Sequence, residues 1–120
     1  LRLEPEHTAL VLELGMNHKG EISALSKTAL PDIGVITNVG VSHIENLGSR
    51  EGILAAKLEL LDGMKPGSPI LLNKDNDMLS TVELPDYDVK WFAIHDETAD
   101  VRAEDIEYLD ASTVFTAVTN

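Results

Sequence analysis

The chain has 120 residues, with 21 acidic side chains against 9 basic ones and a formal net charge of −12. This length suffices for one domain with its own core, the charge argues against nucleic acid as a partner, and the absence of cysteine excludes disulfides and thiolate chemistry. No apolar run approaches the roughly 20 residues of a membrane helix, and no signal-peptide pattern opens the chain, so we expect a soluble, cytoplasmic protein without membrane insertion.

Three apolar runs alternate with two amphipathic segments in the first part of the chain. Strands are predicted at residues 8–13, 32–37 and 69–73, and helices at residues 21–30 and 50–64. This β-α-β-α-β order predicts right-handed crossovers and a parallel sheet.

The rest of the chain is more polar. Residues 73–77 are predicted to turn the chain or to cap a short helix at Met78, and a strand is predicted at residues 89–94. Residues 105–109 and 113–118 flank a turn of Asp110, Ala111 and Ser112, which indicates a hairpin. The sequence therefore predicts a small antiparallel β appendage after the parallel sheet.

Glu13 ends the first predicted strand. An apolar strand with a terminal carboxylate is the pattern of a residue that holds Mg²⁺ beside nucleotide phosphates, although many parallel strands end in Glu or Asp without that role. The phosphate-binding pattern Gly-x-x-x-x-Gly-Lys-Ser/Thr is absent from these 120 residues. If Glu13 is a metal ligand, we expect such a loop in sequence before Leu1.

Lys57 occupies an unusual place on the second predicted helix. With steps of about 100° per residue, it falls near the middle of the apolar arc that contains Ile53 and Met64. Burial would favour the neutral amine and lower the pKa of this lysine, making it a nucleophile or a site for carbamylation by CO₂. The alternative is that the stem packs while the ammonium group reaches solvent.

The second predicted strand ends at Asn38, and His43 follows in a polar loop. Ligands of open parallel sheets bind outside the carboxyl ends of the strands, and a neutral imidazole can bind a metal. A loop histidine is also common on a plain surface. Glu13, His43 and Lys57 would converge on one cation site only if their strands are neighbours and the helix packs back over the sheet.

Four segments of the chain together resemble the Mur ligase family. Leu12–Ile22 resembles the signature Glu-x-Gly-x-Asn-His-x-Gly-Glu-Ile, and Thr37–Glu45 resembles the segment Asn-x-x-x-x-His. Gly48–Glu59 resembles the helix that bears the carbamylated lysine, and Asn73–Asn76 resembles the turn Asn-x-Asp-Asn/Asp. The motifs occur in order at family-like spacing, and the likeness covers residues 8–120.

The resemblance implies a three-layer, P-loop-NTPase-like parallel sheet, here truncated, and an ATP-dependent amide ligase of peptidoglycan synthesis. ATP would phosphorylate the terminal carboxylate of a UDP-N-acetylmuramoyl-tripeptide, and an amine would attack the acyl phosphate. Residues 17–22 favour the branch of the family whose amine is D-alanyl-D-alanine. Asn17 and His18 would then face the muramoyl-peptide.

The resemblance also implies metal and cofactor roles. Glu13 would hold the Mg²⁺ that bridges the nucleotide phosphates. His43 and carbamylated Lys57 would serve a second Mg²⁺ near the acyl phosphate, because a carbamate offers the anionic oxygens that a hard cation prefers. Asn38 would belong to the same site.

The family has three domains, and the likeness covers most of only the middle one. We therefore expect residues 1–120 to be a partial central ATPase domain that lacks the upstream phosphate-binding loop and the N- and C-terminal domains. Alone, it should have no ligase activity and bind ATP weakly or not at all. The alternatives are a sibling Mur or related amide ligase that adds a single amino acid, and a non-catalytic α/β module in which Lys57 is ordinary.

Overall fold

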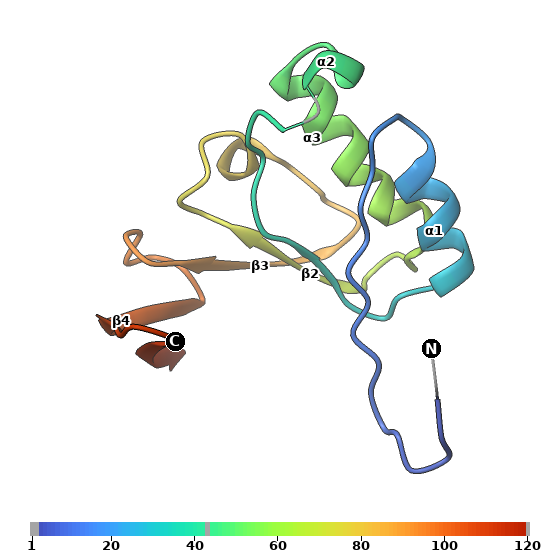
Figure 1. The fold of residues 1–120 in the computed structure, drawn as a ribbon. Coiled ribbons are helices and arrows are strands. Elements are labelled where there is room, and N and C mark those ends of the chain that lie inside the picture. The colour runs from blue at the N-terminus through green and yellow to red at the C-terminus, as the bar shows by residue number, and fades with distance from the viewer. Residues whose placement is uncertain (1–2, 43, 120) are drawn as a thin grey trace.

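A five-stranded sheet forms the centre of the computed structural model, which describes residues 3–42 and 44–119 (Figure 1). The strands are β1 (Gly34–Ile36), β2 (Pro69–Asn73), β3 (Asp88–Ala93), β4 (Val101–Tyr108) and β5 (Thr113–Thr119). They lie in the order β1-β2-β3-β4-β5, with β1 to β4 parallel and β5 antiparallel to β4. The predicted parallel α/β sheet with an antiparallel appendage is confirmed.

The pairing of β1 with β2 sets the position of the core. Gly34 lies opposite Ile70 and Ile36 opposite Leu72, and the side chains of Ile70 and Leu72 are completely buried. A Cβ at Gly34 would lie only 2.8 Å from the sulfur of Met64, so a larger residue there would require the Met64 side chain to move. The close approach lets the chain after the second long helix pack directly on β1.

The helical elements are short. They are α1 (Glu21–Ala29), α2 (Ile44–Leu47), α3 (Arg50–Leu58) and two 3₁₀ helices, η1 (Glu59–Gly63) and η2 (Leu79–Thr81). Figure 1 shows α1 and α3 together on one side of the sheet. The sequence did not predict α2, whereas the short helix predicted at Met78 is present as η2, with Met78 at its N-cap.

The predicted helix 50–64 divides at Leu58, where α3 continues as η1. Ser49 caps the start of α3, since its hydroxyl accepts a hydrogen bond from the Gly52 N–H at 3.2 Å. The tighter η1 turn docks on α1: the Ser26 hydroxyl donates to the carbonyl of Leu60 at 2.5 Å. A Cβ at Gly63 would overlap the Ser26 carbonyl, so this contact excludes larger residues.

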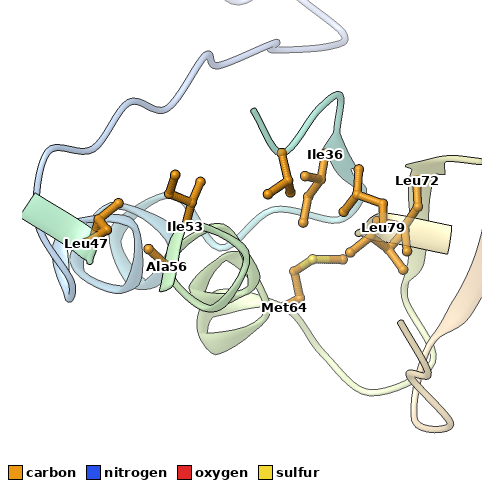
Figure 2. Packing of buried hydrophobic residues seen from close by; sticks show 9 residues of the cluster. Ile36, Leu47, Ile53, Ala56, Met64, Leu72 and Leu79 are labelled. Atoms are coloured by element: carbon orange, nitrogen blue, oxygen red, sulfur yellow. The ribbon is translucent and has the colours of Figure 1, made fainter. Parts of the chain in front are cut away.

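The main hydrophobic core lies between the α3–η1 segment and the β1–β2 pair (Figure 2). Ile53 and Met64, which the helical wheel placed in the apolar arc, are both buried in it. Leu79 of η2 closes the cluster. Its buried members are Ile36, Val39, Leu47, Ile53, Ala56, Met64, Ile70, Leu72 and Leu79.

The predicted strand at residues 8–13 is wrong. These residues have no regular secondary structure, and the side chain of Val11 is 94% exposed. A β-strand exists only through hydrogen bonds to a neighbour, and no described strand pairs with this segment. Glu13 therefore does not stand at a strand end.

No helix within residues 3–42 and 44–119 is long and apolar enough to cross a membrane.

Candidate functional site

The carboxyl ends of β1 and β2 lie side by side, and polar residues follow both strands. The side-chain nitrogen of Asn73, the last residue of β2, donates to the backbone carbonyl of Thr37 at 3.0 Å. Its side-chain oxygen accepts the N–H of Asp75 at 3.0 Å, which turns the chain sharply after the strand. This edge of the sheet is where ligands bind in open parallel folds.

Asn76 joins the two strand ends. Its side-chain nitrogen donates to the side-chain oxygen of Asn38 at 2.7 Å and to the carbonyl of Val39 at 3.3 Å. Its side-chain oxygen accepts the N–H groups of Met78 and Leu79 at 3.2 and 3.0 Å, at the start of η2. One amide thus fixes Asn38, two residues after the end of β1, against the turn after β2.

Arg50 and Asp77 attach α3 to the same place. The guanidinium donates two hydrogen bonds to the carboxylate, at 2.6 and 2.5 Å, and a third to the carbonyl of Val39 at 2.9 Å. The hydrogen bonds from Arg50 lower the pKa of Asp77, and the same pair raises the pKa of Arg50. The helix that bears Lys57 therefore starts at the strand ends.

Asp75 holds the turn against the end of β3. Its carboxylate accepts the backbone N–H groups of Ile94, His95 and Asp96 at distances from 2.6 to 3.2 Å. Burial raises the pKa of Asp75, but these three donors outweigh it, so the pKa lies below its usual range.

The loop that contains Asn17 and His18 is shaped by Glu21. Its carboxylate accepts the backbone N–H of Asn17 at 2.6 Å and that of His18 at 3.1 Å. These two bonds lower the pKa of Glu21. Both side chains of the predicted pair are exposed, as a contact with a bound substrate requires.

Glu59 ties this loop to the helix of Lys57. Its carboxylate accepts the N–H of Gly20 at 2.8 and 2.9 Å and that of Ser23 at 3.2 Å. Gly20 is the residue before α1 and has no side chain to cap the helix, so the carboxylate supplies the cap from another element. Lys57 lies two residues before Glu59 and is half-buried.

The structure thus links Asn38 to the turn after β2, and links the Asn17–His18 loop to the Lys57 helix. Glu13 is exposed in the irregular segment, and His43 lies outside the described residues. Within residues 3–42 and 44–119, no three His, Asp or Glu side chains gather as a metal site would need. The convergence of Glu13, His43 and Lys57 stays a prediction.

Sequence reasoning did not assign a role to four residues that hold the site together. Asn76 lies in the recognised Asn73–Asn76 turn and Glu59 lies beside Lys57, so motif position was the signal that could have found them. Arg50 and Asp77 are 27 residues apart and gave no local signal. Only the alignment of α3 with the strand ends brings that pair together.

A parallel sheet whose strand ends carry a polar, hydrogen-bonded site defines an α/β protein with its candidate ligand site at the carboxyl edge. The family described as Mur ligase middle domain matches residues 1–120, and the chain belongs to this family.

Named relatives agree with this assignment. The chain is 51% identical, over 76 residues, to UDP-N-acetylmuramoyl-tripeptide–D-alanyl-D-alanine ligase of Bacillus subtilis (strain 168), covering 62% of this chain and 17% of that protein. A crystal structure of MurF from Acinetobacter baumannii matches with a TM-score of 0.83 and 33% identity over 98% of this chain and 26% of that one. MurF ligase from Thermotoga maritima in complex with ADP matches with a TM-score of 0.71 and 29% identity over 84% of this chain and 23% of that one.

Proposed function

We propose that this chain is part of an ATP-dependent amide ligase that adds D-alanyl-D-alanine to UDP-N-acetylmuramoyl-tripeptide in peptidoglycan synthesis. The observation that carries the proposal is the family match over all 120 residues, together with relatives whose names state this reaction. The chain spans 17% of the Bacillus subtilis relative's length and 26% of the Acinetobacter baumannii chain, so the proposal concerns the whole parent protein.

The proposed cofactors are ATP and Mg²⁺, and the proposed location is the cytoplasm. The complex of the Thermotoga maritima relative with ADP supports a nucleotide as a reactant. The phosphate-binding loop and the N- and C-terminal domains would lie in other parts of the parent protein, because residues 1–120 contain no Gly-x-x-x-x-Gly-Lys-Ser/Thr pattern.

The proposed reaction has two steps. An oxygen of the tripeptide's terminal carboxylate attacks the γ-phosphorus of ATP, and ADP leaves. The amine of D-alanyl-D-alanine then attacks the acyl carbon, the tetrahedral intermediate expels phosphate, the amine proton leaves, and an amide bond remains. Both steps bring anionic groups together, so the site must offer positive charge or hydrogen-bond donors.

The residues proposed to serve Mg²⁺ are Glu13, His43 and carbamylated Lys57, with Asn38 in the same site. The described residues do not by themselves assemble three carboxylates or imidazoles, and the proposed ligand His43 lies outside them. The proposed role of Lys57 is supported by its position: it is half-buried, and the helix that bears it is attached to the strand ends through Arg50. Asn17 and His18 are proposed to contact the muramoyl-peptide through their exposed side chains. Glu21 fixes this loop by accepting hydrogen bonds from the backbone N–H groups of both residues.

The decisive test uses the full-length parent protein. We expect ATP-dependent ligation of D-alanyl-D-alanine to UDP-N-acetylmuramoyl-tripeptide, and loss of at least about a hundredfold in kcat for Lys57→Ala. Lys65→Ala is the matched control, because Lys65 is exposed. Ligation of a single amino acid in place of the dipeptide would favour a sibling ligase, and full activity of Lys57→Ala would favour a non-catalytic module.

The isolated 120-residue chain gives a second test. We expect no ligation and weak or absent ATP binding in calorimetry. Detectable ligation by this piece alone would contradict the assignment of the phosphate-binding loop to another part of the protein.

A further inference from the structure

The side-chain amide of Asn76 can adopt only one orientation. Its oxygen accepts two backbone N–H groups, from Met78 and Leu79. A flipped amide would point its NH₂ group at the N–H groups of Met78 and Leu79. These backbone donors and the NH₂ group would then all lack acceptors. The NH₂ group of Asn76 must therefore face Asn38 and the carbonyl of Val39.

This orientation fixes Asn38 in turn. The NH₂ group of Asn76 is a donor only, so Asn38 must present its oxygen toward it, as the 2.7 Å contact shows. The NH₂ group of Asn38 then points the other way, and its nitrogen lies 3.4 Å from where a Cβ of Gly40 would be. Among the described residues it has no hydrogen-bond acceptor, and the Asn38 residue is exposed.

The free hydrogen-bonding group of Asn38 is therefore a donor. Two N–H groups suit an anionic oxygen, whereas Mg²⁺ needs an oxygen ligand. The Asn38 oxygen faces Asn76, so the NH₂ group is the part of this side chain that is left without a partner among the described residues.

We propose that Asn76 is a positioning residue that turns the N–H donors of Asn38 toward the bound reactants, so that Asn38 binds an anionic phosphate or carboxylate oxygen and not the metal ion. The proposal rests on the proposed function, because it places Asn38 at the reaction site. It assigns Asn38 a role of the kind that stabilises negative charge during transfer.

Asn76→Asp in the full-length protein tests the positioning role. An aspartate keeps an oxygen for the Met78 and Leu79 N–H groups, but it loses the donor to the Val39 carbonyl and offers only acceptors to Asn38, whose amide must then reverse. We expect kcat/KM to fall at least about tenfold while the thermal midpoint stays near that of Ser80→Asp. Ser80→Asp is the matched control, because it adds the same charge at an exposed position in the same segment without touching Asn38.

Asn38→Asp tests the donor role without disturbing the turn, since Asn76 can still donate to a carboxylate. We expect a loss of at least about tenfold in kcat/KM with an unchanged Mg²⁺ concentration at half-maximal rate. A higher KM for ATP identifies a phosphate oxygen as the partner, and a higher KM for the tripeptide identifies its carboxylate. A lower Mg²⁺ requirement in Asn38→Asp, or wild-type kcat/KM in either variant, would overturn the proposal.

The amide orientation can be measured without any activity. Neutron diffraction from the full-length protein locates the deuterium atoms on Asn38. Deuterium directed away from Asn76 supports the positioning role, and deuterium directed at Asn76 refutes it. If the wild-type protein fails to ligate, the proposed function falls, while this measurement still decides the orientation.

Discussion

Two apolar segments of this chain have similar sequences and opposite fates. Residues 69–73 form β2, where Ile70 and Leu72 are completely buried between two parallel neighbours. Residues 8–13 are also mostly apolar, yet Val11 is 94% exposed and no described strand pairs with the segment. The contrast shows that an apolar run becomes a strand only when neighbours satisfy its backbone.

Polar groups show the same contrast. Asn76, Asp75 and Asp77, at the end of β2, each make several hydrogen bonds to groups from other elements. Glu13, at the end of the unpaired run, makes none to the described residues. A polar side chain acquires a fixed position from the elements around it, which the β2 end has and the first segment lacks.

Leu72→Ala should have the largest effect on stability. It empties space in the core between α3 and the β1–β2 pair, and should lower the free energy of unfolding by about 2–5 kcal/mol. Val11→Ala truncates a side chain that is 94% exposed, and should change the free energy of unfolding by less than about 0.5 kcal/mol. Urea unfolding of the 120-residue chain measures both.

The same pair of variants in the full-length protein sharpens the comparison. If the segment gains a strand partner there, Val11→Ala should become clearly destabilising in that context only. A large effect of Val11→Ala in the 120-residue chain would mean that residues 8–13 are already packed.

Glu59→Gln should have an intermediate effect. The amide keeps one acceptor oxygen but loses the charge that Gly20 and Ser23 contact, which should cost about 1–2 kcal/mol of unfolding free energy. Glu83→Gln is the matched control at an exposed position. Hydrogen exchange should rise at Gly20 and Ser23 in Glu59→Gln; unchanged protection there would show that the carboxylate does not cap α1.

The smallest expected effect is on acid stability. The pKa of Asp75 lies below its ordinary value of 3.8, so its ionised form stabilises the fold above that pH. This contribution disappears as the pH falls through the lowered pKa. Asp75→Asn should therefore lose less stability than wild type between about pH 6 and about pH 3. Asp86→Asn, at an exposed position, is the control and should show the same pH dependence of unfolding free energy as wild type. If wild type and both variants show the same pH dependence, Asp75 does not contribute to acid stability.

Much of the fold could be predicted because local patterns are strong. The periodic apolar positions of α1 and α3, and the apolar runs of β2 and β3, locate those elements closely. The division of α3 at Leu58 could not be predicted, since it depends on Ser26 and Gly63 meeting across two elements. The strand at residues 8–13 was mispredicted because hydropathy reports a preference for burial and not the presence of a partner.

The sequence by itself determined the family and the parallel pairing of the strands that became β1 and β2, because motifs and hydrophobic periods are written locally along the chain. Only the tertiary structure decided that Asn76 orients Asn38, that Arg50 meets Asp77 and that Glu59 caps α1. These contacts join residues separated by 27 to 39 positions, and a hydrogen bond forms only where the fold brings donor and acceptor within about 3 Å at the right angle.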